Sequence, residues 1–373
     1  MRKWTAGLIV LLFPMAAQAQ GVTASEIVIG QTSSFSGAIG GEVKEQTEGA
    51  RLYIDWVNDN GGVNGRRIRL ESMDDAFDPK RAAANARALV GKGVFALFLT
   101  RGTPQNEAIL PVVRETGTPL VAPSTGAIVL HEPLNPLVFN VRTRYQTEAE
   151  NAIAQLTSQG ITRIAIVHVN DSFGKDGLAG FMSGLKKAHL QPAGVYSYDR
   201  TKGDTHEAAR AVIALAPQAI VTAGHSKPLA SLVREVREAG LAGVSIVTLS
   251  NLSSQSFLKD LGEHKYGVIV MQVFPNPQQM LTRIASEMHR LAAARQGFVM
   301  SHMAEEGFAA AKVLVEGLRR AGRNPTRASF IAGLESLRDY DLGGLKVSYG
   351  PASRSGLNYV EASIVNRKGT FTQ

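Results

Sequence analysis

Residues 26–79 decide the fold of this chain: EIVIGQTSSF SGAIGGEVKE QTEGARLYID WVNDNGGVNG RRIRLESMDD AFDP. Residues 27–30 read as a short buried strand, and a loop of small residues follows over 34–41. A helix is predicted next, because Ala50, Tyr53, Ile54 and Val57 are apolar at helical spacing. Asn60-Gly61-Gly62 predicts a left-handed helix ending. The pattern so far is strand, loop and helix.

The same stretch continues with a second strand and a second helix. Arg67-Ile68-Arg69-Leu70 alternates polar and apolar residues, which is typical of a strand. Asp78 followed by Pro79 predicts a helix start, with Asp78 as the cap and Pro79 in the first helical position. Strands that alternate with helices in this way favour a parallel sheet built from strand-helix-strand units.

The first residues predict an export signal rather than a part of the fold. Arg2 and Lys3 supply a positive start, residues 6–13 form a short apolar core, and Ala17-Gln18-Ala19 fits a signal-peptidase site. The apolar run is shorter than the ~20 residues that a membrane-spanning helix needs. We therefore expect a signal peptide over 1–19, a mature chain that begins at Gln20, and a location in the periplasm.

Composition limits the classes of function. The roughly 350 residues that remain after cleavage exceed what one hydrophobic core usually covers, so two lobes are expected. Removing Arg2 and Lys3 lowers the formal net charge from +8 to +6. The basic residues are scattered among acids with no aromatic interleaving, which argues against nucleic-acid binding. The chain has no cysteine, which excludes disulfides, thiolate catalysis and zinc held by cysteine.

The alternation of strands and helices extends along most of the chain. Residues 280–293 and 303–320 read as long amphipathic helices, and a further helix starts at Asn324-Pro325-Thr326. A first series of strands is expected at 27–30, 68–73, 94–100 and 119–122, with a crossing strand at 137–141; a second series is expected at 163–169, 195–198, 219–223, 244–249 and 268–271, with late strands at 345–349 and 359–365.

Two expected strand-to-helix junctions carry hydroxyl groups and glycine. They are Arg101-Gly102-Thr103-Pro104 and Pro123-Ser124-Thr125-Gly126. In an open parallel sheet, ligands bind beyond the carboxyl ends of the strands, where helix N-termini offer free N–H groups. The two junctions together could bind one anion, such as a carboxylate. The residues alone leave open the alternative that Thr103 and Ser124 only cap their own helices.

The ordered landmarks of residues 26–79 closely resemble the start of the leucine/isoleucine/valine-binding protein family, the type I periplasmic solute-binding proteins of ABC importers. The resemblance implies an α/β fold of two Rossmann-like lobes, in which helices flank parallel sheets and a three-crossing hinge joins the lobes. The implied N-terminal lobe comprises 20–142 and 275–350, and the C-terminal lobe comprises 143–274 and 351–373. The crossings are expected near Val141-Thr143, Val273-Pro275 and Gly350-Ser353.

The resemblance also implies a binding cleft between the lobes. Gly102-Thr103 and the junction containing Ser124, Thr125 and Gly126 fall where the family's receptors hold the α-carboxylate of the ligand. Phe173 matches an aromatic position that lines the family's cleft. His225 or Ser226 matches a ligand-contacting position, with the register uncertain by one residue. The 35–42 loop is expected to form one wall.

One segment departs from the family's pattern. Amino-acid receptors of this family carry an acidic residue after the strand that corresponds to 244–249, where it accepts the ligand's ammonium group. Here residues 249–254 read LSNLSS and contain no acid. A buried ammonium group without an anionic partner costs several kcal/mol. We therefore expect an organic acid, aromatic acids included, or a neutral amide-like solute, rather than leucine or valine.

Enzyme motifs are absent from the sequence. The glycines at 37, 40 and 41 do not have the spacing of a dinucleotide-binding loop, and Gly224-His225-Ser226-Lys227-Pro228 ends in proline rather than the glycine of a serine-hydrolase elbow. No cofactor and no metal are expected. The leading hypothesis is a monomeric receptor that passes a small solute to the membrane permease of an ABC importer. The alternative is a periplasmic sensor domain of the same fold that reports its ligand to a signalling partner.

Overall fold

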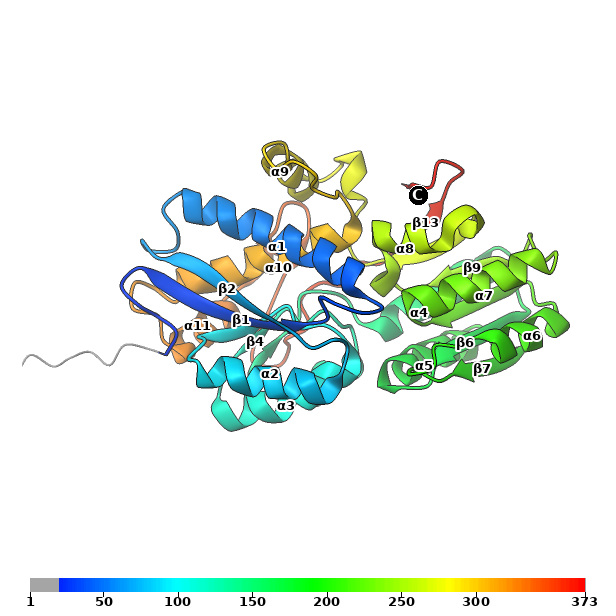
Figure 1. Ribbon diagram of the computed structural model, residues 1–373, viewed down its shortest axis with the longest axis horizontal. Coiled ribbons are helices and arrows are strands. Elements are labelled where there is room, and N and C mark those ends of the chain that lie inside the picture. Colours follow the sequence, from blue (N-terminus) through cyan, green and yellow to red (C-terminus); the bar gives the residue numbers. More distant parts are fainter. Residues whose placement is uncertain (1–19, 373) are drawn as a thin grey trace, which may run out of the picture.

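The computed structural model describes residues 20–372, and the predicted signal peptide lies outside them. The chain forms two lobes, each built around its own sheet (Figure 1). In the first lobe five parallel strands are ordered β2-β1-β3-β4-β5. Their bounds are β1 Glu26–Ser33, β2 Arg67–Asp74, β3 Ala96–Phe98, β4 Leu120–Val121 and β5 Val138–Phe139.

The second lobe contains a seven-stranded sheet in the order β14-β13-β10-β9-β8-β6-β7. Five of these strands are parallel, and β13 and β14 add an antiparallel edge. Their bounds are β6 Ile164–Val169, β7 Gly194–Tyr198, β8 Ala219–Ala223, β9 Ser245–Thr248, β10 Val268–Gln272, β13 Glu361–Val365 and β14 Phe371–Thr372. A separate hairpin pairs β11 (Tyr340–Asp341) with β12 (Lys346–Val347). The predicted α/β class with two parallel sheets is confirmed.

Helices cover both sheets. The first lobe carries α1 (Gly40–Asp59), α2 (Pro79–Gly91), α3 (Thr103–Thr116), α9 (Arg283–Ala292), α10 (His302–Arg320) and α11 (Arg327–Glu335). The second lobe carries α4 (Tyr145–Ser158), α5 (Ser172–Lys187), α6 (His206–Leu215), α7 (Ser226–Glu238) and α8 (Gln255–Leu261).

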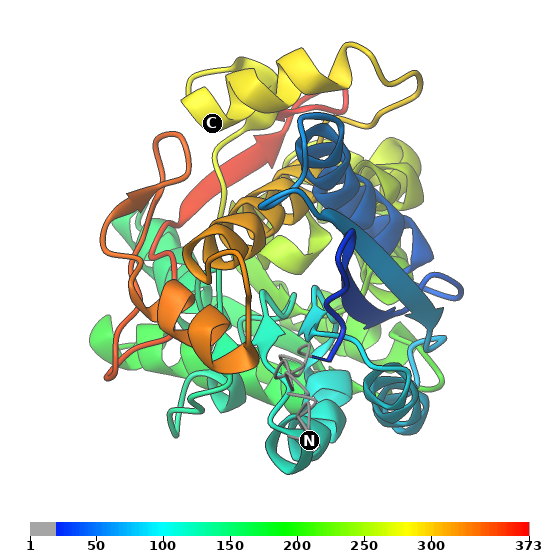
Figure 2. The ribbon, with the colours of Figure 1, turned by 90° about the vertical axis from the view of Figure 1, so that its left-hand side faces the viewer.

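Helix α10 is buried on nearly every side, which differs from the amphipathic helix that we predicted from the sequence. It lies directly against α1, as Figure 2 shows. Two glycines allow this close approach. A Cβ atom on Gly49 of α1 would lie 1.9 Å from the carbonyl oxygen of Ala304, and one on Gly307 of α10 would lie 1.8 Å from that of Gln46. Because α1, α9 and α11 all pack against α10, this helix buries polar side chains as well as apolar ones.

The local signals of residues 26–79 are confirmed. Asp78 accepts hydrogen bonds from the backbone N–H groups of Lys80 and Arg81, and Pro79 opens α2. Gly61 and Gly62, with φ of 91° and 68°, follow the end of α1 in the left-handed conformation that was predicted. Sequence reasoning missed α6, β11 and β14. It also expected a helix directly after Pro123-Ser124-Thr125-Gly126, where the chain instead forms a loop and a short 3-10 turn, Ile128–Leu130.

Three segments connect the lobes. The chain passes from β5 to α4, returns after β10, and crosses again on its way to β13. The third crossing lies a few residues after the expected Gly350-Ser353 turn, because the backbone of Arg354 to Tyr359 runs beside that of Asn140 to Thr143. Within residues 20–372, no helix has the length and apolar character needed to cross a membrane.

Candidate ligand-binding site between the lobes

A pocket lies between the lobes, at the carboxyl ends of the strands of both sheets. Its empty volume is about 390 Å³, which includes space that is open to solvent. Both lobes contribute to the lining, which consists of Ile39, Glu42, Phe77, Arg101, Gly102, Thr103, Pro104, Ser124, Tyr145, Phe173, Arg200, His225, Asn251 and Leu252.

Arg101 contributes a buried positive charge to the pocket. It follows β3, and only 5% of its surface is exposed. Its Nη1 donates to Ser124 Oγ at 3.2 Å and contacts Met303 Sδ at 3.2 Å, and its Nη2 donates to the carbonyl oxygen of Asn251 at 2.9 Å. These contacts use three of the five guanidinium N–H groups. No carboxylate among the described residues forms an ion pair with Arg101, although its charge acts over a longer range on Glu42 and Glu45.

Ser124 holds Arg101 in place. Its hydroxyl donates to Glu306 Oε1 at 2.9 Å and accepts from Gln46 Nε2 at 2.7 Å and from Arg101. A serine hydroxyl has one hydrogen and two lone pairs, so all of its bonding capacity is used. Ser124 therefore has no hydrogen-bonding capacity left for a ligand, and it fixes the orientation of Arg101.

The N-terminus of α3 also borders the pocket. Gly102 is the residue before the helix, with a φ of 94°, and Thr103 is the first helical residue, so the cap is Gly102 rather than Thr103. Thr103 Oγ1 lies 2.7 Å from Thr125 Oγ1. A helix N-terminus carries a partial positive charge, which adds to the charge of Arg101 in the same pocket.

Phe77 enters the pocket from a strained turn. Its φ of 64° is in the left-handed region, which costs a non-glycine residue about 1 kcal/mol or more. Hydrogen bonds hold the turn: Asp75 accepts from the N–H of Phe77, and the carbonyl oxygen of Phe77 accepts from Gln105 and Arg200. The guanidinium of Arg200 also stacks on the Phe77 ring, 4.0 Å from its centre. Since Arg200 follows β7, this contact joins the two lobes.

Asp171 neutralises Arg200. Their charged atoms are 2.8 Å apart, and Asp171 also caps α5 by accepting from the N–H of Gly174. Burial alone raises the pKa of Asp171, but the His225 ring, whose Nε2 lies 3.8 Å from Asp171 Oδ2, a hydrogen bond from the N–H of Gly174 and the charge of Arg200 outweigh it and lower the pKa to about 2. Arg200 therefore has its counter-charge within the protein, in contrast to Arg101.

Aromatic rings line much of the rest of the pocket. The His225 ring is 4.9 Å from that of Phe77 and 5.5 Å from that of Phe173, and Phe173 is 4.9 Å from Tyr145. Burial lowers the pKa of His225, although Asp171 acts in the opposite direction, so His225 is neutral near pH 7. The rings pack against one another and give the pocket an apolar wall with one neutral imidazole.

Four of the predicted site residues line the pocket, namely Thr103, Ser124, Phe173 and His225. The other three, Thr125, Gly126 and Ser226, do not line the pocket. Thr125 contacts Thr103, Ser226 donates to Asp260 Oδ2 at 2.6 Å, and Gly126 packs where a Cβ atom would lie 2.5 Å from the carbonyl oxygen of Thr143. Between the two residues left open by the uncertain register, the structure places His225 in the lining and Ser226 outside it.

The acid-free segment after β9 faces Arg101. At the position where the family resemblance implied an acid, the carbonyl oxygen of Asn251 in the second lobe accepts a hydrogen bond from the guanidinium of Arg101 in the first lobe. An acid does line the pocket, but it is Glu42 at the start of α1. The 35–42 segment, expected to form one wall, contributes Ile39 and Glu42 to the lining. Sequence reasoning did not assign Phe77, Arg101, Tyr145, Arg200 and Asn251 to the site; the one usable signal was that Arg101 directly follows a buried strand.

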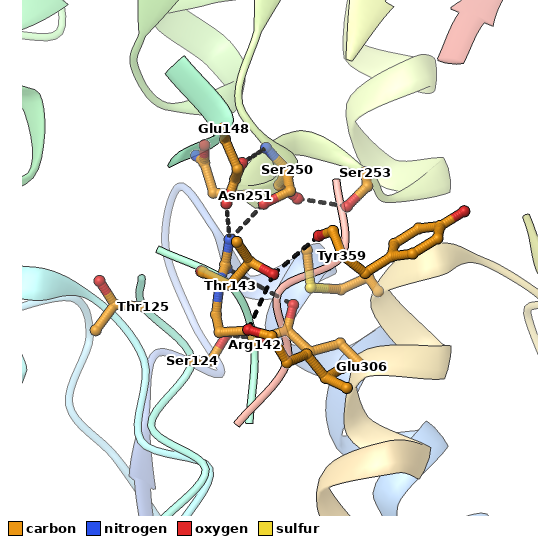
Figure 3. Close-up of polar contacts among 12 residues, drawn as sticks. Ser124, Thr125, Arg142, Thr143, Glu148, Ser250, Asn251, Ser253, Glu306 and Tyr359 are labelled. Carbon is orange, nitrogen blue, oxygen red and sulfur yellow. Dashed lines mark hydrogen bonds and ion pairs between the residues drawn. The ribbon is translucent and has the colours of Figure 1, made fainter. Parts of the chain in front are cut away.

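A buried charge cluster lies next to the pocket at the first crossing. Figure 3 shows Arg142 between Glu148 and Ser250 of the second lobe and Glu306 of the first. Arg142 Nη2 donates to Glu148 Oε1 at 2.7 Å, and Nη1 lies 3.7 Å from Glu306 Oε2. Glu306 also accepts from Ser124, so hydrogen bonds and ion pairs connect this hinge to Arg101.

The two lobes are closed over the pocket. Besides the contacts of Arg101 and Arg200, Ser172 of the second lobe donates to Glu107 Oε2 at 2.7 Å, and Glu45 accepts from the N–H groups of Gln255 and Ser256. Across the described part of the chain, no group of three His, Asp or Glu side chains could hold a metal ion.

Comparison with known proteins agrees with this geometry. The sequence profile of the periplasmic binding protein family matches residues 26–358. The chain belongs to this family. It is 24% identical over 265 residues to the Leu/Ile/Val-binding protein of Escherichia coli (strain K12), covering 67% of this chain and 69% of that protein. The members of the family are solute-binding proteins rather than enzymes.

Solved structures confirm the fold. A substrate-binding periplasmic protein from Ralstonia solanacearum is 34% identical, with a TM-score of 0.87, covering 93% of this chain and 99% of that one. A fatty acid ABC transporter substrate-binding protein from Thermomonospora curvata is 20% identical, with a TM-score of 0.83, covering 94% and 91%. The second likeness concerns the fold alone.

Proposed function

We propose that this protein is a periplasmic receptor that captures a small organic carboxylate between its lobes and delivers it to the permease of an ABC importer. Family membership supports the receptor role, since the family consists of solute-binding proteins. On this proposal the protein has no catalytic activity and is exported by its signal peptide over 1–19.

The buried, unpaired guanidinium of Arg101 is the observation that carries the ligand class. A charge that is removed from water without a counter-charge costs several kcal/mol. A carboxylate that reaches the two remaining N–H groups of Arg101 removes this cost and forms charge-assisted hydrogen bonds. The N-terminus of α3, at Gly102 and Thr103, favours the same sign of ligand.

The same observation argues against leucine, isoleucine and valine. An α-amino acid needs an anionic partner for its ammonium group, and residues 249–254 contain no acid; there the carbonyl oxygen of Asn251 accepts a hydrogen bond from Arg101. Glu42 is the acid among the residues that line the pocket, and burial raises its pKa, which disfavours the charged form that would pair with an ammonium group. The names of the curated relatives, which include Leu/Ile/Val-binding proteins, therefore do not transfer with the fold. The fatty acid receptor of the same fold illustrates that this architecture holds other acids.

A thermal-shift screen of the mature chain tests the proposal. The panel pairs carboxylates with their neutral amides, for example benzoate with benzamide, and includes the branched-chain amino acids. A ligand at a hundred times its dissociation constant stabilises the protein by about 2.7 kcal/mol. We expect carboxylates to raise the melting temperature and their amides to leave it unchanged. A panel in which no carboxylate raises the melting temperature would overturn the proposal.

A further inference from the structure

Glu42 is a buried carboxyl group whose bonding is incomplete. It lies at the start of α1, lines the pocket, and has only 1% of its surface exposed. Its Oε1 accepts no hydrogen bond from any residue that the structure describes. It also forms no ion pair within the described residues, and Arg101 acts on it only through the longer-range field.

A buried carboxyl oxygen without a hydrogen bond is unfavourable unless a ligand donates one to it. A buried acceptor that loses its water without gaining a donor costs about 1–3 kcal/mol, and more when it is charged. Burial accordingly raises the pKa of Glu42, and the positive charge of Arg101 opposes this only in part. The pocket therefore contains two groups with complementary requirements for a ligand. Arg101 needs an acceptor with a negative charge, and Glu42 needs a donor.

We infer that the solute is an aromatic acid that carries a hydroxyl or amino substituent, with its carboxylate on Arg101 and its donor group on Glu42. This inference rests on the proposed function, because it assumes that Arg101 holds the carboxylate. Glu42 acts as a specificity-determining residue. It rejects acids without a donor, because binding them would leave its Oε1 buried and unpaired.

The aromatic lining supports a flat body between these two groups. Phe77 enters from the first lobe, Phe173 and Tyr145 from the second, and the His225 ring lies between the two phenylalanines. Aromatic rings pack favourably edge to face or offset against other rings. The ligand's ring would then be in contact with both lobes, which would favour their closure.

Titration calorimetry with four probes tests the inference: benzoate, 3-hydroxybenzoate, 4-hydroxybenzoate and the methyl ether of the tighter hydroxybenzoate. The ether keeps the oxygen but removes the donor. In the wild type we expect one of the two hydroxybenzoates to bind about ten- to a hundredfold more tightly than benzoate. It should exceed its own methyl ether in affinity by a similar factor. In Glu42→Met, whose side chain is similar in size but has no carboxylate acceptor, the ratio of these affinities should fall to about one. Glu42→Gln keeps a neutral acceptor and should therefore keep part of the preference for the hydroxybenzoate.

A matched control is Glu48→Met, on the same helix but outside this pocket, with 44% of its side chain exposed. It should keep the wild-type preference. The inference is overturned if no hydroxybenzoate is preferred, if the preference survives in Glu42→Met, or if other carboxylates bind while all benzoates fail. In each of those cases, binding of a carboxylate would still support the receptor. If no carboxylate binds at all, the proposed function fails as well.

Discussion

Replacing Arg101 with methionine should separate ligand affinity from the stability of the free protein. Methionine keeps much of the side chain's length and removes the charge. Removing one partner of a buried charge pair typically costs about 2–5 kcal/mol. The dissociation constant of a bound carboxylate should therefore rise about thirtyfold to several thousandfold. The melting temperature of the ligand-free protein should change little, because the removal of a buried charge offsets the loss of the hydrogen bonds to Ser124 and Asn251.

Calorimetry with a carboxylate and its neutral amide measures this effect most cleanly. The wild type should bind benzoate far more tightly than benzamide, and Arg101→Met should bind the two about equally. Arg114→Met, an exposed position on α3, is the control and should retain the wild-type discrimination. If Arg101→Met still preferred the carboxylate by the wild-type factor, some other group would hold the anion and our reasoning about Arg101 would be wrong.

Three further substitutions test the surroundings of the site. Ser124→Ala should weaken carboxylate binding by about 1–2 kcal/mol, roughly five- to thirtyfold, because Arg101 loses an oriented acceptor. Arg142→Met should lower the free energy of unfolding by about 3–5 kcal/mol, and by less at pH 5 than at pH 8, because burial raises the pKa of Glu148, which can then take up a proton. Glu305→Gln should raise stability at pH 8, because burial raises the pKa of Glu305 well above its usual value.

The sign of the Glu305 effect follows from proton linkage. A carboxyl whose pKa is raised on folding binds its proton more tightly in the folded state. The wild type therefore loses stability relative to Glu305→Gln as pH rises above about 4.5, by up to about 1.4 kcal/mol per pH unit until the folded-state pKa is reached. Thermal or urea unfolding between pH 4 and 9 measures the difference. Parallel pH profiles for the two proteins would contradict it.

Exposed positions provide the remaining controls. Ser158→Ala should leave carboxylate affinity unchanged, and Arg290→Met should leave the free energy of unfolding within about 0.5 kcal/mol of the wild type. A Ser124→Ala protein with wild-type affinity would show that the orientation of Arg101 does not depend on this hydroxyl. An Arg142→Met protein as stable as the wild type at pH 8 would show that water reaches the hinge cluster.

The sequence was sufficient for the features that depend on neighbouring residues. The cap at Asp78, the helix ending at Gly61 and the alternation of strands and helices are local signals, and each is confirmed. The junction at Gly102-Thr103 could also be located, because ligand sites in such sheets follow the carboxyl ends of the strands. These rules need only the residue types and their spacing.

The chemistry of the pocket could not be predicted in the same way. Arg101 and Glu42 look like ordinary surface charges in the sequence, and only the closure of two lobes, with their contacts far apart in the chain, buries them. Ser124 lines the pocket, but the partner that accepts its hydrogen is Glu306, which is 182 residues away in the sequence. Helix α10 appeared amphipathic because its buried polar residues cannot be distinguished from exposed ones by periodicity.

A crystal structure of the mature protein with the carboxylate that stabilises it most would test the central claim directly. We predict that the ligand lies between the closed lobes, with a carboxylate oxygen about 3 Å from the guanidinium nitrogens of Arg101. A ligand bound with its anionic group elsewhere, or a branched-chain amino acid in the pocket with its ammonium group on an acidic residue, would contradict the account.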